Sequence, residues 1–307
     1  ASLIAFYILG MGTFVLLRHY QFQTQTWDMG IFDQTFWNTI HGRVMQNSLE
    51  EIPNHLGIHM SPFLFLLVPG YALFPSPYYL LIVQLLALAL GAVPLYFLTR
   101  RLLGSERWAL VFAAAYLLYP PLHWVNWFDF HEIAFFVPLL LAGVYYAETR
   151  RWLPAWLFLL LAASTKEDAI LATAAVGLWF FLQPSSSDEH GVFWTPKRKH
   201  GLVLTVALLA YFLFAVKLIM PAFGGGLLRL DRYAELGRTP SEIARTIATH
   251  PLTTAAIAFT PEKLNYLFWL LLPVAFLPFA APRALILLAP GIAENLLTTF
   301  ASQFSGM

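Results

Sequence analysis

The chain alternates between long apolar blocks and short polar segments. Apolar blocks lie near residues 1–17, 78–98, 108–124, 133–147, 152–165, 169–183, 201–220, 264–280 and 284–300. Because a bilayer core about 30 Å thick takes roughly 20 helical residues, these blocks predict an all-α protein that crosses the membrane about nine times. We expect one transmembrane domain over 1–307, with long outer segments at 18–77 and 221–263.

The composition agrees with a membrane protein. Hydrophobic residues make up 59% of the 307 positions and charged residues only 11%, against roughly 25% charged in soluble domains. The net charge of +1 provides no field that would attract nucleic acid. The absence of cysteine excludes disulfides and thiolate chemistry. Because the sequence starts at Ala1 and stops at Met307 soon after an apolar block, we expect that a C-terminal part is missing.

Basic residues concentrate in the short turns on one side. With a cytoplasmic N-terminus, the turns near 99–107, 148–151, 184–200 and 281–283 face the cytoplasm and hold nine of the 18 Lys and Arg residues. Cytoplasmic loops are enriched in Lys and Arg. This distribution predicts an inner or plasma membrane protein whose N-terminus is cytoplasmic and whose active face is outside.

The first outer segment contains an amphipathic pattern. Apolar residues at 29, 32, 36, 37 and 40 follow a helical spacing and predict a helix over about 29–41 in the membrane interface. Asp28 could simply cap this helix, and Asp33 could be solvated. Either carboxylate could instead serve as a general base or cation ligand. The proline-broken stretch 62–77 predicts a second interfacial or re-entrant element, and 240–249 a short helix.

Two outer turns carry ionisable residues on the same face: Asp129-Phe130-His131-Glu132 and Lys166-Glu167-Asp168. The helices beside them are only about 14–15 residues long, or roughly 21–23 Å, so the turns should lie below the outer surface. Ionisable groups at that depth normally face a cavity or the protein interior. The alternative is that Lys166 neutralises its neighbours and Asp129 or Asp168 caps a helix.

Other polar residues give weaker signals. His55 and His59 are four apart, but Pro53 and Gly57 make a two-histidine metal site on a regular helix a weak hypothesis. His59 fits better as a polar residue that enters a cavity. Basic side chains of the outer segments could bind phosphate or form loop salt bridges; they are Arg18, Arg229 and Arg232.

The layout resembles the GT-C superfamily of glycosyltransferases that use lipid-linked sugars. The resemblance covers about 1–183 and is carried by Trp27-Asp28-Met29-Gly30-Ile31-Phe32-Asp33-Gln34, His59-Met60-Ser61-Pro62, Phe128-Asp129-Phe130-His131-Glu132 and Lys166-Glu167-Asp168. These blocks look like the signatures of an uncharacterised prokaryotic family of membrane proteins grouped with that superfamily. The second turn departs from the usual acid-Pro type, and Glu167-Asp168 adds two carboxylates.

The resemblance implies transfer of a sugar from a polyprenyl-phosphate donor, a membrane lipid, on the outer face. Asp28 matches the catalytic acid of the first outer segment, with Asp33 as its rival. Asp129 or Glu132 matches the second acid, and Lys166 a lipid-phosphate contact. His59, Glu167, Asp168 and Arg232 would complete the donor site. A divalent cation, Mg²⁺ or Mn²⁺, could be held by Asp28, Asp129, His131 and Glu132.

Two other classes of function remain open at this point. A secondary transporter would also place ionisable residues in submerged turns, but it predicts inverted repeats, and none is visible here. A structural subunit bound to other membrane subunits would suit the 27 Phe, 13 Tyr and 10 Trp residues. In such a complex His123 or His131 could ligate a pigment.

Overall fold

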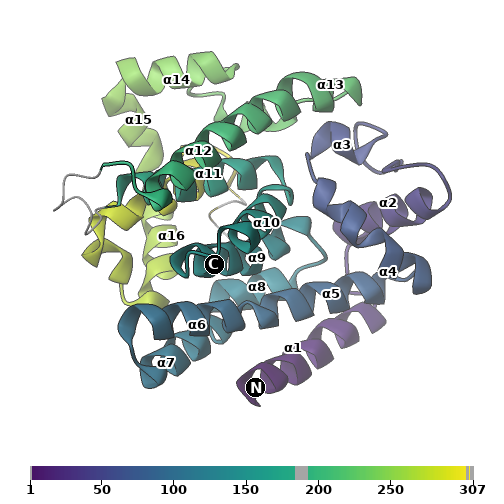
Figure 1. Cartoon of the computed structure of the whole chain (residues 1–307). Coiled ribbons are helices and arrows are strands. Elements are labelled where there is room, and N and C mark those ends of the chain that lie inside the picture. The colour runs from purple at the N-terminus through teal and green to yellow at the C-terminus, as the bar shows by residue number, and fades with distance from the viewer. Residues whose placement is uncertain (1, 184–192, 302–303, 305–307) are drawn as a thin grey trace.

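The computed structural model describes residues 2–183, 193–301 and 304, and this part of the chain is all-α (Figure 1). Helices occupy most of the first two thirds of the chain. They are α1 (Ser2–Tyr20), α5 (Pro77–Leu90), α6 (Ala92–Leu103), α7 (Glu106–Leu117), α8 (Pro120–Trp127), α9 (Phe136–Glu148), α10 (Trp152–Ala163), α11 (Glu167–Leu182) and α12 (Pro196–Phe214). Their bounds follow the first seven predicted apolar blocks, and α5 and α6 form one continuous segment.

Local sequence explains several helix ends. Ser76 and Ser105 cap α5 and α7 by accepting hydrogen bonds from the backbone N–H groups of Tyr78 and Trp108. Hydroxyl side chains at this position satisfy an N–H group that the helix leaves free. Helix α6 ends at Leu103 and is followed by Gly104, whose φ of 63° is readily adopted by glycine.

Within the part of the chain that the structure describes, three helical segments are long and apolar enough to cross a membrane: Ser2–Tyr20, Pro77–Leu103 and Pro196–Ala222. The bent pair α7–α8, with a 42° angle, makes a fourth if it counts as one span. The fold is therefore that of an all-α membrane protein, and nine spans stay a prediction.

The last two predicted spans differ from the structure. Block 264–280 is divided into α16 (Pro261–Leu271) and the 3-10 turns η7 (Leu272–Val274) and η8 (Leu277–Ala280). Block 284–300 contains η9 (Pro282–Leu287) and the nine-residue α17 (Ala289–Leu297). Prolines within these blocks remove backbone donors and interrupt the helices. They are Pro273, Pro278 and Pro290.

The first outer segment forms a set of short helices. They are the π-helix η1 (Thr26–Gly30), α2 (Ile31–Ile40), α3 (His55–Ile58), the 3-10 helix η2 (Pro62–Leu66) and α4 (Val68–Leu73). Helix α2 buries Phe32 and Phe36 in a core with Tyr71 of α4. The helix predicted over 29–41 is thus present, and the helix predicted near 240–249 is α14 (Pro240–Thr249). After α14 comes α15 (Pro251–Ala258).

Hydrogen bonds and ion pairs distinguish the two ends of the helical bundle. At one end, the backbone N–H of Phe63 donates to the carbonyl of Ser164 at 3.0 Å. This bond connects the first outer segment with the turn before α11. The opposite end of the bundle is marked by Glu148, the last residue of α9, which pairs with Lys197 at 2.6 Å. The turns predicted to be outside therefore meet at one end, away from the Lys197–Glu148 pair.

Helices α11 and α12 approach each other through glycine. A Cβ atom on Gly201 would lie 2.6 Å from the Gly177 carbonyl oxygen and 2.7 Å from the Phe181 backbone nitrogen. The Thr205 hydroxyl also donates across the interface to the carbonyl of Ala174 at 3.2 Å. Small residues allow membrane helices to pack this closely.

We predict that Gly201→Val destabilises the protein by about 1–3 kcal/mol, because the added side chain must separate α11 from α12. The matched control is Gly10→Val, since a Cβ atom on Gly10 of α1 meets nothing within 4 Å. Unfolding in detergent, followed by circular dichroism, measures both variants. Equal stability of the two would contradict the close packing of α11 on α12.

Candidate functional site

Four separate segments meet near Phe32, at the end of the bundle that holds the turns predicted to be outside. The ring of Phe32 is 4% exposed and packs edge-on against His55 at 5.2 Å and His131 at 5.8 Å. The ring of His59 lies 5.7 Å from that of His55. The segments that contain Phe32, His59 and His131 thus lie next to one another. Glu167 of the fourth segment contacts His59 by a hydrogen bond.

Asp129 has a structural role. Its side chain is fully buried and pairs with Arg18 at 2.6 Å, while its second oxygen accepts the backbone N–H of Gln25 at 2.6 Å. Arg18 also donates to the carbonyl of Trp127 at 3.0 Å. This pair fastens the end of α1 to the turn after α8. Each oxygen of Asp129 therefore already has a partner within the protein, and the helix that follows begins after His131 rather than at Asp129.

Gln84 holds the same turn from the middle of α5. Its amide nitrogen donates to the carbonyls of Val125, at 3.2 Å, and Asp129, at 3.4 Å, and its oxygen accepts the N–H of His131 at 2.8 Å. Sequence reasoning missed this residue. The available signal was a lone amide inside the apolar block 78–98, since buried polar groups need hydrogen-bond partners.

Glu132 is the most deeply buried acid of the site. Its side chain is 1% exposed and lies 3.9 Å from the ammonium of Lys166, which is 21% exposed. Burial alone would raise the pKa of Glu132, but Lys166 and three histidines outweigh it and lower that pKa. Burial likewise opposes charge on Lys166, and nearby carboxylates, Glu132 foremost, raise its pKa. Both groups are therefore charged at neutral pH.

Glu167 connects the Lys166 turn with the His59 segment. Its carboxylate accepts hydrogen bonds from His59 Nδ1 and from the backbone N–H of Met60, each at 2.9 Å. These contacts bring His59 and Glu167, two of the predicted site residues, together. Asp168 accepts the adjacent N–H of Ala169 at 2.9 Å, which places it in the first turn of α11 beside the same cluster.

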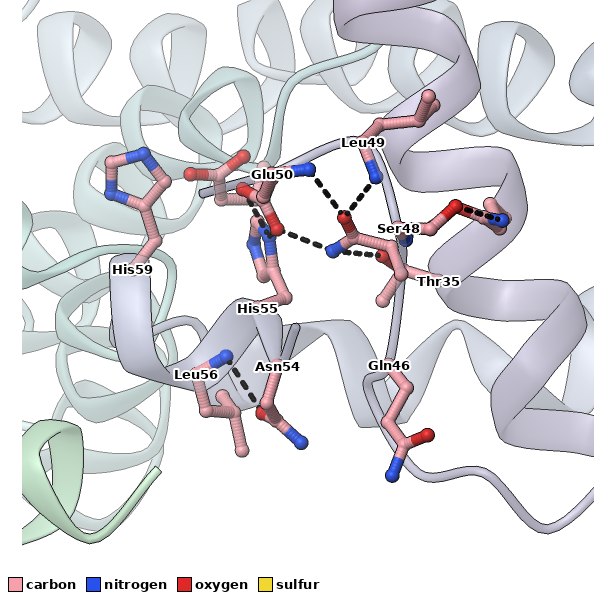
Figure 2. Close-up of polar contacts among 12 residues, drawn as sticks. Thr35, Gln46, Ser48, Leu49, Glu50, Asn54, His55, Leu56 and His59 are labelled. Carbon is pink, nitrogen blue, oxygen red and sulfur yellow. Dashed lines mark hydrogen bonds and ion pairs between the residues drawn. The ribbon is translucent and has the colours of Figure 1, made fainter. Parts of the chain in front are cut away.

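A second acid–histidine pair, Glu50 and His55, lies near His59 (Figure 2). His55 Nδ1 lies 3.0 and 3.1 Å from the two oxygens of Glu50. Asn47 donates to the same carboxylate and to the Thr35 hydroxyl. His55 is 1% exposed. Glu50 was not identified from the sequence, because its distance of five residues from His55 belongs to a loop rather than to a regular element.

Asp28 lies at the more open edge of the site. It is inside η1, whose cap is Gln25, so the expectation that Asp28 caps a helix is wrong. Its carboxylate lies 3.4 Å from His131 Nε2, and the two side chains are 25% and 28% exposed. His131 Nδ1 also contacts the carbonyl of Asp129 at 3.1 Å. Both ring nitrogens thus face acceptors, which favours the protonated imidazolium.

Two predicted site residues lie outside this cluster. Asp33 accepts a hydrogen bond from the Tyr71 hydroxyl at 2.6 Å, on the side of α2 that faces α4. The guanidinium of Arg232 packs over the Phe300 ring at 4.4 Å. Its positive charge also attracts the carboxylate of Glu294. Glu294 of α17 lies close enough to Lys166 and Asp168 to interact with both electrostatically. Glu294 is therefore an acid of this region that sequence reasoning missed.

The metal prediction does not fit the donor set. Asp129 is committed to Arg18 and Gln25, which leaves Asp28, His131 and Glu132 of the four expected ligands. Among the residues that the structure describes, no group of three or more His, Cys, Asp or Glu side chains is arranged to hold a metal ion. A cavity of about 610 Å³ lies at the far end of α11, between Trp179, Arg198 and Arg283, and does not open onto the cluster.

Comparison with known proteins identifies the chain at the family level. The model of a family described as "Predicted membrane protein (DUF2079)" matches residues 18–305. No curated protein and no solved structure matches the chain. The match covers all the segments that form the cluster.

We predict that Asp129→Ala destabilises the protein by about 3–5 kcal/mol, because the largely buried Arg18 would lose its anionic partner. Glu106→Ala is the matched control, since Glu106 pairs with Arg100 at 3.1 Å but the two side chains are 67% and 51% exposed. That exposed pair should contribute at most about 1 kcal/mol. Chemical unfolding measures both variants, and similar losses would contradict the structural role of Asp129.

The Asp28–His131 pair predicts a pH dependence. Burial lowers the pKa of His131, but Asp28 and Glu132 outweigh it and raise that pKa above its ordinary value of 6.5. The resulting stabilisation is fully present below pH 6.5 and is lost as the pH rises through the raised folded-state pKa. Asp28→Asn should lower the pKa of His131, measured by NMR of labelled histidine in nanodiscs. An unchanged pKa would show that the pair does not form.

Proposed function

The chain belongs to the DUF2079 family of predicted membrane proteins, and we propose that it is a glycosyltransferase that takes a sugar from a polyprenyl-phosphate donor on the outer face of the membrane. One observation carries the proposal. Acids, histidines and a lysine from four separate segments lie together at the end of the bundle that the positive-inside rule places outside. Such a set of charges is costly near a membrane and marks a functional site.

Asp28 is the proposed general base. Of the acids suggested by the sequence, it combines partial exposure with a position in the cluster, whereas Asp129 is fully buried and Asp33 contacts Tyr71. His131 orients the Asp28 carboxylate from the side of the buried turn. An acceptor hydroxyl that reaches the edge of the site would meet Asp28 first.

Lys166 and His131 supply the positive charge that a departing phosphate needs. The ammonium of Lys166 lies at the surface of the cluster with Glu132 behind it. During transfer, the bond between the anomeric carbon and the phosphate oxygen breaks, and its electron pair stays on the lipid phosphate. The acceptor oxygen bonds to the anomeric carbon while its proton passes to Asp28. Positioned cations stabilise charge that develops on a leaving group.

Exposed aromatic residues suit contact with a lipid donor. Trp27 is 63% exposed beside Asp28, and Phe128 is 42% exposed with its ring 5.3 Å from that of His131. Aromatic rings are common at membrane interfaces, where they contact both headgroups and acyl chains. These two side chains border the Asp28–His131 pair on the outside of the cluster, where a prenyl chain would approach from the bilayer.

We predict that Asp28→Asn lowers sugar transfer at least 100-fold, because the acceptor proton loses its base, and that Asp33→Asn keeps most of the activity. The assay follows the release of polyprenyl phosphate from polyprenyl-phosphate mannose or glucose in membranes that contain the protein. Lys166→Met should instead weaken donor binding. Full turnover by Asp28→Asn would remove Asp28 from the mechanism, and no turnover of any donor by the wild type would contradict the proposed function.

A further inference from the structure

The second outer segment contacts the site through its backbone. Its first helix, α13 (Met220–Ala222), lies beside α3 (Figure 1). In the loop after α13, the N–H of Gly226 donates to the carbonyl of Gly57 at 3.0 Å. Gly57 belongs to α3 and is two residues from both His55 and His59. The mechanism above gives this loop no role, although it meets the segment that carries both histidines.

Glycine on both sides makes this contact possible. A Cβ atom on Gly225 would overlap the carbonyl group of Gly57, and one on Gly57 would lie 2.9 Å from the carbonyl oxygen of Phe223. These obstacles are backbone atoms, so rotation of a side chain would not relieve them. The N–H of Gly225 donates to the carbonyl of Met220 at 3.0 Å, and Met220 is fully buried. The loop therefore sets the distance between α3 and α13.

The residues that follow α3 hold Glu167. His59 Nδ1 and the backbone N–H of Met60 each donate to its carboxylate at 2.9 Å. Met60 also packs in the same hydrophobic core as Met220. Glu167 is the first residue of α11 and directly follows Lys166. The loop, α3, Glu167 and Lys166 are thus joined in sequence by direct contacts or by peptide bonds.

An ion pair joins the same two outer segments. Arg229 lies three residues beyond the loop and pairs with Glu51 at 3.0 Å, and the two side chains are 45% and 58% exposed. Such an exposed pair contributes at most about 1 kcal/mol. It therefore offers a way to disturb the contact without adding atoms to the packed loop.

We propose that the glycine loop 224–226 is a positioning element of the site. It holds α3 at the distance at which His59 and Met60 fix Glu167, and it thereby sets the place of the Lys166 ammonium. The contact itself is independent of the reaction, whereas its effect on binding of the donor phosphate rests on the proposed function. The second outer segment thus acts on the phosphate through Lys166.

The test uses Gly225→Ala in the full chain in nanodiscs. The backbone of Gly225, unlike that of Gly224 and Gly226, lies outside the left-handed region. Alanine therefore adds only a methyl group, and Gly57 must move away by about 1 Å or more. Gly291→Ala is the matched control, because a Cβ atom on Gly291 meets no described atom within 4 Å.

Two measurements follow the effect. Calorimetry gives the affinity for a short-chain polyprenyl phosphate. NMR of labelled histidine follows the Nδ1 signal of His59, which is identified by its absence in His59→Gln. Circular dichroism shows whether each variant is folded.

We expect Gly225→Ala to shift the His59 signal and to weaken binding of the lipid phosphate about tenfold. Glu167→Met lacks both acceptor oxygens and should weaken binding by itself. Gly225→Ala should then add no further loss, because the loop acts through Glu167. Gly291→Ala should match the wild type in both measurements.

The ion pair provides a second test if Gly225→Ala does not fold. Arg229→Glu places two carboxylates opposite each other and should cause the same changes to a smaller extent. The double variant Glu51→Arg/Arg229→Glu restores an ion pair and should restore the His59 signal and the affinity. Wild-type behaviour of Arg229→Glu in both measurements would overturn the inference.

Two further outcomes would overturn the inference and leave the glycosyltransferase proposal standing. One is a folded Gly225→Ala with the wild-type His59 signal and affinity, and the other is an additive loss in Gly225→Ala/Glu167→Met. If the wild type binds no polyprenyl phosphate, the proposed function fails. The His59 signal then decides the positioning role alone: a shift in Gly225→Ala supports it, and an unchanged signal overturns it.

Discussion

The site depends on the attraction between the buried carboxylate of Glu132 and the ammonium of Lys166. A carboxylate that is 1% exposed loses its hydration and stays charged only if nearby cations compensate. Lys166, His55, His59 and His131 provide that compensation. Since these side chains belong to different segments, the charge of Glu132 requires the first outer segment, the turn after α8 and the turn before α11 to meet. Lys166, which is partly exposed, remains able to meet a second anion.

Neighbouring residues of the turn after α8 have opposite roles. Asp129 points toward Arg18 and fixes the turn to α1, while His131 and Glu132 point toward Asp28 and Lys166. Gln84 holds the backbone between them. The scaffold contacts thus surround the site without occupying its more exposed edge, where Asp28, Trp27 and Phe128 lie. In the proposed mechanism, this turn holds His131 where it orients the Asp28 carboxylate.

Part of this arrangement follows from the sequence. Apolar block lengths place the first seven helical passages, and the amphipathic spacing predicts α2. Alternation of the passages also puts Asp129-Phe130-His131-Glu132 and Lys166-Glu167-Asp168 at one end. The sequence does not separate Asp129 from Glu132, because which acid meets Arg18 depends on how α1 packs beside α8. Glu50, Gln84 and Glu294 escape prediction for the same reason, since their partners are distant in sequence or lie across an irregular loop.

The most direct test of the account is an experimental structure of the chain in lipid nanodiscs with a short-chain polyprenyl phosphate bound. We expect the phosphate to lie against Lys166 near His131, with the prenyl chain passing Trp27 or Phe128 into the bilayer. A phosphate bound at the far end of α11, near Arg198 and Arg283, with Lys166 still engaged only by protein carboxylates, would contradict it.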